Sequence, residues 1–448
     1  MMKNGSLRSG TLSFAEVLAA SIALIGLTMT PVLIAPVIYA YAGNATWFAY
    51  AFAGLMLIFV ALNLNQFTRR ESATGSMYNY AADNLGWFGG AVGGWSLIWA
   101  YVFVGAAVFG ALGLFGQQFG AFFGHPIPVW LTIPSIAAIC WYLSYRDIAL
   151  STIVMLVFES ASVLVILTLI FIVFTKHPLI DPTQFTVSSV PFSTLGIGIG
   201  LAIFGLVGFE SATAFGEEAH QPLIIIPRAV IWSVVIATLF FVLATYSEVV
   251  GLHDSKTTLD KLDAPLGTLS DLLHVGFLRV LITIGAIFSA FSVALACVNT
   301  AARIMMAMAS RGLLPKRLAF VSPRYGTPVT ALLISAGAML ALTFGALGLH
   351  VRPIDIFGYG GTLSSFGFIV IYGMIAVAAP LYLKRIGELR KRDVVISAVA
   401  VVLLLVPLAT LFYPVPPPPS NWFVYWFVGY LVAGTALIYA TTRPRSAA

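Results

Sequence analysis

Long apolar stretches alternate with short polar connections along the whole chain. A helix that crosses a bilayer needs about 20 mostly apolar residues, because each residue advances the helix by only about 1.5 Å. Windows of this kind lie at residues 15–42, 46–67, 89–113, 128–145, 151–174, 193–218, 228–250, 277–309, 328–349, 354–383, 394–413 and 422–442. The pattern predicts an all-α integral membrane protein with about 12 transmembrane helices. No connection between these windows resembles a folded soluble domain, so we expect one membrane domain over 15–442.

Two of the predicted spans carry helix-breaking residues near their centres. In the first span, Gly26 and Pro31 flank two threonines, and a proline removes a backbone N–H and clashes with the preceding turn. In the sixth, Gly205 and Gly208 bracket the centre, and Glu210 follows at once. Each feature has a plainer interpretation, a proline kink in the first span and close helix packing in the sixth. We predict that both helices are interrupted.

The two predicted interruptions are five spans apart, which favours two inverted five-helix repeats, at 15–174 and 193–383, followed by two peripheral helices at 394–442. Irregular backbone is tolerated at membrane depth only where it is buried or lines a cavity. A helix N-terminus at such a break offers free N–H groups to a carboxylate, and freed carbonyls can accept from an ammonium group. A zwitterion such as an α-amino acid fits this chemistry.

Composition and charge placement support the same picture. Of the 448 residues, 60% are hydrophobic and 9% are charged, whereas soluble domains contain about 25% charged residues. If the N-terminus is cytoplasmic, 18 of the 23 lysines and arginines lie in cytoplasmic segments, as the positive-inside rule requires. We therefore expect cytoplasmic tails at 1–14 and 443–448. The net charge of +6 reflects this topology and not nucleic-acid binding.

Three segments carry a resemblance to a known family. They are the stretch Gly208–Ala212 with Gly216–Pro222 and Ile226–Ala229, the stretch Ser72–Tyr80, and the stretch Ala301–Pro315 with Tyr325–Pro328. With these motifs the chain resembles the amino acid–polyamine–organocation (APC) transporter family, which has a leucine-transporter-like fold. The resemblance implies a permease of the plasma (inner) membrane that moves amino acids by alternating access, as a proton symporter or an exchanger.

The same resemblance implies a set of substrate-binding positions at the two breaks and on the third and tenth helices. Phe204 lies where family members often carry an aromatic gate; its alternative role is ordinary packing. The expected substrate-binding residues are Gly26, Met29, Thr30, Pro31, Leu97, Ala100, Tyr101, Phe204, Gly205, Leu206, Gly358 and Thr362.

The fifth helix departs from one variant of the family pattern. Some members place there a lysine that stands in for a bound sodium ion, whereas this helix carries Glu159 near its middle. An ionisable residue at membrane depth costs at least ~2.5–3.5 kcal/mol on insertion scales, so Glu159 and Glu210 are candidates for proton coupling. Each could instead be a protonated carboxyl that hydrogen-bonds to helix backbone. Glu248 lies nearer a helix end and is expected to be solvated or paired.

Other functions are less well supported. Ser289 and Ser292 could contribute to a sodium site, although hydroxyls in membrane helices more often bond to their own backbone. We expect no cofactor and no catalytic residues, because the sequence contains no zinc-protease, nucleophile-elbow or phosphate-loop motif. A receptor or membrane enzyme is the alternative class. The expected partners are a small-molecule substrate, an amino acid or a polyamine, and the lipid bilayer.

Overall fold

The computed structural model describes residues 12–71, 77–146, 149–186, 190–215, 219–253, 255, 257–262, 264–322, 325–410, 412–413, 415–416 and 418–442. In this part of the chain the fold is helical, and the only β-type pairing is an isolated bridge between Leu12 and Ala219. Most of both predicted tails, and parts of two of the three motifs, lie outside the described residues.

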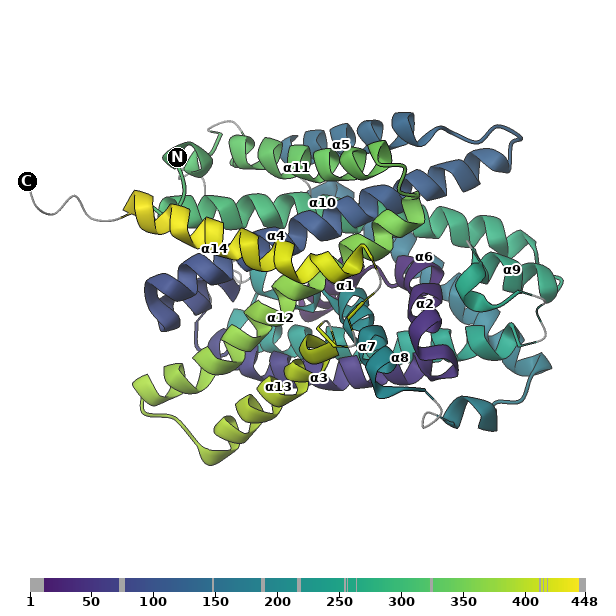
Figure 1. Ribbon diagram of the computed structural model, residues 1–448, viewed down its shortest axis with the longest axis horizontal. Helices are drawn as coiled ribbons and strands as arrows, with labels where there is room; N and C mark the ends of the chain where they lie inside the picture. The colour runs from purple at the N-terminus through teal and green to yellow at the C-terminus, as the bar shows by residue number, and fades with distance from the viewer. Residues whose placement is uncertain are drawn as a thin grey trace, which may run out of the picture.

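The α-helices are α1 Phe14–Ile25, α2 Met29–Ala42, α3 Thr46–Thr68, α4 Met77–Ala121, α5 Val129–Arg146, α6 Ala149–Lys176, α7 Phe192–Leu206, α8 Pro222–Gly251, α9 Pro265–Leu272, α10 Phe277–Ser310, α11 Val329–Gly348, α12 Pro353–Arg385, α13 Lys391–Thr410 and α14 Phe423–Thr442. Short 3₁₀ helices connect them: η1 Gly43–Ala45, η2 Pro182–Phe185, η4 Phe209–Phe215, η5 Leu259–Lys261, η6 Lys316–Ala319 and η7 Ser420–Trp422. Several long helices, α4, α10, α11 and α14 among them, run roughly along the long axis of the molecule (Figure 1).

Ten helical segments of the described chain are long and apolar enough to cross a membrane. Two differences separate this number from the twelve predicted windows. First, α2 and α3 form one continuous 40-residue segment, Met29–Thr68, because only the single 3₁₀ turn η1 lies between them. Second, α5 is not among the ten. The protein is therefore a multi-pass membrane protein.

The first predicted span is interrupted within the predicted region. Gly26 has a φ of 71°, a left-handed conformation that glycine adopts without steric cost and that ends α1. The chain resumes as α2 at Met29, and Pro31 is the third residue of that helix. Its missing N–H is harmless there, because the first turn has no intrahelical partners for its N–H groups. Gly26, and not Pro31, therefore breaks the helix.

The sixth predicted span is interrupted as well. α7 ends at Leu206, Val207 is extended, and Gly208 has a φ of 113°. The chain then continues as the 3₁₀ helix η4. The two interruptions lie against each other, because a Cβ added to Gly208 would lie 3.0 Å from the Leu24 carbonyl oxygen. The Ser21 hydroxyl also donates to the Phe209 carbonyl over 3.1 Å.

α4 and α12 pack closely against each other beside these breaks. A Cβ on Gly360 would lie 2.9 Å from the Phe103 carbonyl oxygen, and Gly367 packs against the Ser96 carbonyl in the same way. Small residues allow helix backbones to approach this closely in membranes. α4 is longer than the predicted window because a second helical stretch precedes Gly86, where the φ of 66° marks a kink.

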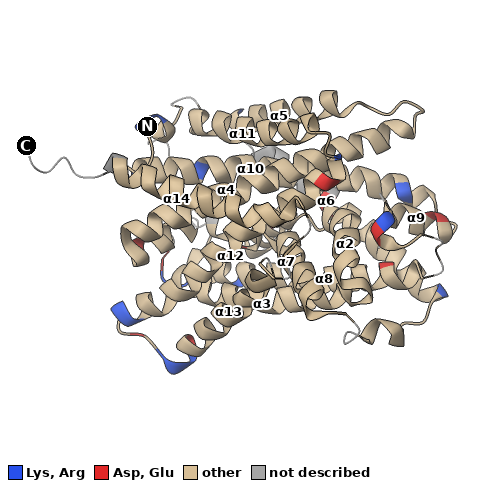
Figure 2. Ribbon diagram, viewed as in Figure 1, with Lys and Arg blue, Asp and Glu red and all other residues tan. Residues whose placement is uncertain are grey.

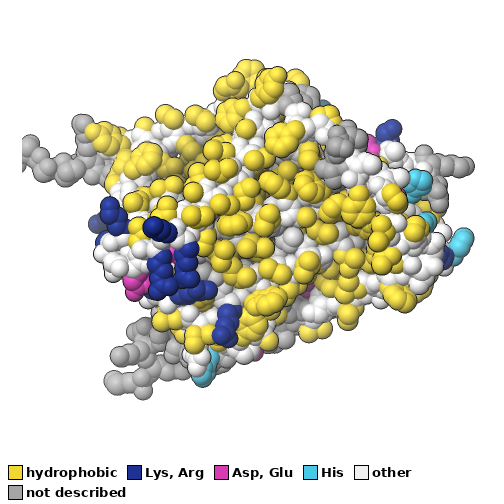
Figure 3. All heavy atoms as spheres, turned by 90° about the horizontal axis from the view of Figure 1, so that it is seen from below, with side chains coloured by type: hydrophobic (Ala, Val, Ile, Leu, Met, Phe, Trp, Pro, Cys, Tyr) yellow, Lys and Arg dark blue, Asp and Glu magenta, His cyan; other side chains and the backbone are white. Residues whose placement is uncertain are grey.

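The surface agrees with a membrane environment. Large apolar side chains such as Phe171, Leu239 and Val402 are exposed, and hydrophobic atoms cover most of the face shown in Figure 3. Charged residues gather toward the two ends of the long axis, including the loop between α12 and α13 (Figure 2). At that end, Arg70 pairs with Glu388 over 2.7 Å and Arg311 pairs with Asp83 over 2.7 Å.

Candidate substrate site at the two helix breaks

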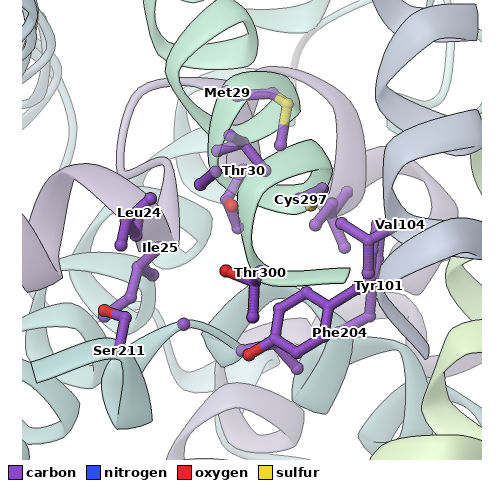
Figure 4. A pocket seen from close by; sticks show the side chains of 15 residues that line it. Leu24, Ile25, Met29, Thr30, Tyr101, Val104, Phe204, Ser211, Cys297 and Thr300 are labelled. Carbon is purple, nitrogen blue, oxygen red and sulfur yellow. The ribbon is translucent and has the colours of Figure 1, made fainter. Parts of the chain in front are cut away.

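A cavity lies where the two interruptions meet (Figure 4). Its walls come from α1, α2, α4, α7, η4, α10 and the residues between α7 and η4. The lining residues are Leu24, Ile25, Met29, Thr30, Ile34, Tyr101, Val104, Phe204, Val207, Gly208, Ser211, Val293, Ala296, Cys297 and Thr300. The open volume of about 30 Å³ holds only about one or two water molecules, so a larger ligand requires a wall to move.

The lining is mostly apolar. Thr30, Ser211 and Thr300 contribute hydroxyl groups, and Tyr101 contributes a phenol that is already hydrogen-bonded. No described lining residue carries a charged side chain. An apolar pocket with a few polar groups is typical of small-molecule sites. Its chemistry suits a neutral side chain better than a cationic one.

Phe204 lies between the cavity and α12. Its ring lines the cavity, contacts the Phe357 ring at a centroid distance of 5.4 Å, and packs on Gly361. A Cβ on Gly361 would lie 2.7 Å from the Phe204 ring, so only glycine leaves room for the ring in this rotamer. The ring therefore separates the small cavity from α12, and its role as a gate stays a prediction.

The structure brings some of the predicted substrate-binding residues together and not others. Met29, Thr30, Tyr101 and Phe204 line the cavity. Gly26 lies just behind it, with Val293 2.9 Å from a Cβ placed there. The predicted residues that do not line it are Pro31, Leu97, Ala100, Gly205, Leu206, Gly358 and Thr362.

The reasons differ among these residues. Ala100 packs on Gly367 of α12, because helical geometry turns it away from the face that carries Tyr101 and Val104. Gly205 lies against Thr30 and the Tyr50 hydroxyl, whereas the Thr362 hydroxyl donates to the Gly358 carbonyl of its own helix. These residues support the walls of the cavity.

Sequence reasoning missed the face of α10. Val293, Ala296, Cys297 and Thr300 line the cavity at spacings of three, four and seven residues, so they form one helical stripe. The stripe is visible in the sequence as small and medium residues at helical spacing. Which stripe faces the breaks depends on the rotation of α10, and local sequence does not determine that rotation.

Glu210 is held by three donors at the edge of the cavity. Its Oε1 accepts from the Tyr101 hydroxyl over 2.6 Å, and its Oε2 accepts from the Gly208 N–H over 3.1 Å and from the Tyr372 hydroxyl over 3.4 Å. The residue is 4% exposed. Glu210 thus links the second interruption to α4 and α12 and fixes the orientation of the Tyr101 ring in the cavity wall.

Glu159 holds the first interruption from the opposite side. Its Oε1 accepts from the Thr28 N–H over 2.9 Å and from the Ser289 hydroxyl over 3.1 Å. The Met29 N–H donates to the Ser289 oxygen over 3.3 Å. A carboxylate and a hydroxyl therefore cap the N-terminus of α2, where the helix dipole favours negative charge. The N–H groups of Thr28 and Met29, which the zwitterion hypothesis left free, already have acceptors.

The two serines predicted as candidates for a sodium site, Ser289 and Ser292, lie in different surroundings. Ser289 lies beside Glu159 at the break, whereas the Ser292 hydroxyl donates to the Phe288 carbonyl of its own helix over 3.0 Å. Among the described residues, no cluster of three or more histidine, cysteine, aspartate or glutamate side chains forms a metal site. Of the two serines, only Ser289 therefore lies at the first break.

The Gly208→Ala substitution tests the second interruption. We expect it to lower stability by about 1–3 kcal/mol, because alanine is strained at a φ of 113° and its Cβ would press on the Leu24 carbonyl. Thermal unfolding of detergent-purified protein measures this effect. Gly337→Ala in α11 is the matched control, since no atom lies within 4 Å of a Cβ there. Equal melting temperatures for the two variants would contradict the strained geometry.

Comparisons with known proteins bear on the family of this chain. The family model described as "Amino acid permease" matches residues 17–442. The branched-chain amino acid permease BcaP of Bacillus subtilis is 26% identical over 353 residues, covering 74% of this chain and 73% of that protein. The aromatic amino acid transport protein AroP of Escherichia coli is 27% identical over 354 residues, 75% of this chain and 74% of its own. The low-affinity putrescine importer PlaP of Escherichia coli is 26% identical over 309 residues, 66% of each chain.

Proposed function

This chain belongs to the amino acid permease family of the APC superfamily, and from this premise we propose that it is a secondary transporter of amino acids in the plasma membrane. Members of this family are transporters and not enzymes. The single observation that carries the proposal is the cavity between the two interrupted helices, which lies deep in an otherwise tightly packed helical bundle. A site at the junction of two broken helices suits alternating access, since either helix half can move while the other remains fixed.

The proposed architecture has twelve spans. It counts the α1–α2 pair as the first span, α7 with η4 as the sixth, and includes α5. Spans one to five and six to ten then form two inverted repeats, and α13 and α14 are peripheral. In this arrangement both termini are cytoplasmic, and the basic loop between α12 and α13 faces the cytoplasm, as the positive-inside rule favours.

The proposed substrate is a neutral α-amino acid. The cavity lining contains aliphatic groups from Leu24, Ile34 and Val293 and lacks a charged side chain among the described residues. A cationic side chain would lose its hydration there without a partner, at a cost of several kcal/mol. Thr30, Ser211 and Thr300 provide the hydroxyls that can bond to the ammonium and carboxylate groups of the substrate. A cationic amino acid or a polyamine is the alternative, supported by the likeness to the putrescine importer.

Counterflow tests the function and separates the substrates. Purified protein in liposomes loaded with an unlabelled neutral aliphatic amino acid should accumulate the labelled form from outside. We expect unlabelled aliphatic amino acids to compete at least ten times more effectively than lysine or putrescine, because the cavity offers no carboxylate to a second cation. Absence of counterflow with every amino acid and polyamine would remove the transporter proposal, and preference for lysine or putrescine would select the alternative.

Proton coupling is proposed at Glu159. Glu159 is 3% exposed, and its carboxyl group accepts hydrogen bonds from the Thr28 N–H and the Ser289 hydroxyl at the start of α2. Adding a proton neutralises the group that complements the helix dipole and weakens its hold on α2. Because Met29 and Thr30 of α2 line the cavity, the protonation of Glu159 and the shape of the substrate site are linked.

A further inference from the structure

Glu248 is a second buried carboxyl group that the proposed mechanism does not use. It lies three residues before the end of α8 and has no exposed surface. Neither of its carboxyl oxygens has a hydrogen-bond partner among the described residues. The sequence-based expectation that Glu248 is solvated or paired is therefore wrong, because the neighbouring helices enclose this end of α8.

On α3, which packs against α8, the titratable group is Tyr50, whose ring contacts that of Phe241, seven residues before Glu248. The other described elements that pack against α8 carry further charged or titratable residues, and none of them hydrogen-bonds to Glu248: Glu16 of α1, Tyr39 and Tyr41 of α2, Glu159 and Lys176 of α6, Glu210 of η4 and Asp271 of α9. A carboxyl group this isolated has no positive partner to hold it as an anion.

Tyr50 connects Glu248 to the substrate cavity. The Tyr50 hydroxyl would lie 3.2 Å from a Cβ on Gly205, and the Thr30 methyl group would lie 2.9 Å from the same atom. Thr30 lines the cavity. The hydroxyls of Tyr50 and Thr30 are buried and have no hydrogen-bond partner in the described chain. Tyr50 and Thr30 therefore both pack on Gly205, and their hydroxyls, like the Glu248 carboxyl, have no partner in the described chain.

A second cavity lies beyond Glu248. Val249, next to Glu248 on α8, and Leu252, which directly follows the helix, line it together with Tyr39, Asp181 and His253. Its volume of about 110 Å³ is enough for several water molecules. Residues of η5 and of the segment before η2 complete it, at the end of the molecule that also carries α9 (Figure 1). This polar cavity therefore lies beside the last turn of α8, the turn that carries Glu248.

We propose that Glu248 is a proton-binding site that exchanges protons with the cavity beside α2, η2 and η5. A proton from water in that cavity bonds to a carboxylate oxygen and gives a neutral acid, and the return step releases the same proton to water. The Tyr50 hydroxyl, between Glu248 and Thr30, senses which form is present and transmits the difference to the substrate cavity. This inference rests on the proposed transport function and assigns it a second site of proton coupling, on the outer side of the substrate.

The Glu248→Gln variant tests the site in proteoliposomes. Glutamine has the shape of the protonated carboxyl and cannot ionise. We expect counterflow to stay within about twofold of the wild type at acidic pH, where the wild-type carboxyl is protonated, because counterflow needs no net proton movement. Net uptake driven by an acidic exterior should fall at least tenfold and become independent of external pH between 5 and 8.

Two further variants make the result decisive. Asp260→Asn removes an exposed carboxylate of η5 near the same end and should behave as wild type in every assay. Glu248→Leu should lose the pH response and melt no lower than the wild type, since it removes an unpaired buried polar group. The inference is overturned if Glu248→Gln keeps the wild-type response to external pH, or if Glu248→Leu loses counterflow and melts lower. A wild-type protein without counterflow would instead reject the transport function itself.

Discussion

Replacing Glu159 with alanine is expected to abolish transport. The substitution leaves the Thr28 N–H and the Ser289 hydroxyl without their buried acceptor, and each unsatisfied group costs about 1–3 kcal/mol. It also removes the negative charge from the N-terminus of α2, worth up to about 2 kcal/mol in a partly buried setting. We expect counterflow below 1% of the wild-type rate and a clearly lower melting temperature, measured on the same purified samples.

Glu159→Gln separates the charge from the hydrogen bonds. The glutamine carbonyl can accept from the same two donors, so the protein should fold and bind substrate. If Glu159 carries the coupled proton, substrate affinity in detergent should vary less than twofold between pH 5 and 8 in this variant, whereas it varies at least tenfold in the wild type. Ser292→Ala on α10 is the control, because that hydroxyl bonds only within its own helix. An unchanged pH response in Glu159→Gln would exclude Glu159 as the proton carrier.

The positions of the helices were predictable because the membrane imposes a simple rule on composition. Lipid cannot hydrogen-bond to the backbone, so each span must be a long apolar helix, and hydropathy finds it. The interruption at Gly26 was also predictable, since a glycine inside a predicted span lowers the stability of a continuous helix there. Pro31 was the more prominent signal but not the cause, because its place in a helix depends on where that helix begins.

The partners of the buried carboxyl groups could not be predicted from the sequence. Glu159 contacts residues 131 and 130 positions away, and Glu210 contacts Tyr101 across 109 positions. Such contacts depend on how each helix is rotated about its axis, and a nearly uniform apolar helix gives little indication of its rotation. Tyr101 on α4 was predicted because the family resemblance implied it. The α10 stripe from Val293 to Thr300 had no such support and was missed for the same reason, the unknown rotation of the helix.

Glu210 and Glu159 are held in different ways, and this difference assigns them different roles. Glu159 accepts from donors on one oxygen, and its other oxygen has no partner in the described chain. Glu210 uses both oxygens and joins η4 to α4 and α12. A carboxyl with an unused oxygen has room for a proton, whereas one that is fully engaged is better suited to fixing the positions of its donors. We therefore expect Glu210 to be a positioning residue for Tyr101 and Gly208.

Replacing Glu210 with leucine should accordingly have an effect as large as that of Glu159→Ala. The change leaves the Tyr101 and Tyr372 hydroxyls and the Gly208 N–H without an acceptor, and each unsatisfied buried donor costs about 1–3 kcal/mol. The Tyr101 ring, which lines the substrate cavity, would lose its fixed orientation. We expect counterflow to fall at least 100-fold and the melting temperature to drop.

Tyr101→Phe and the double variant identify the interaction responsible. Phenylalanine removes one donor and keeps the ring, so this variant alone should lose about 1.5–3 kcal/mol, the range for a hydrogen bond to a charged group. Combined with Glu210→Leu, it should cost less than the sum of the two, because the leucine variant then leaves one donor fewer unpaired. Glu210→Gln should lower the transport rate and keep the wild-type pH profile, since a positioning residue does not carry the coupled proton. Additive losses in the double variant would contradict the claim that Glu210 orients Tyr101. A pH profile that flattens in Glu210→Gln would instead make Glu210 a candidate proton carrier again.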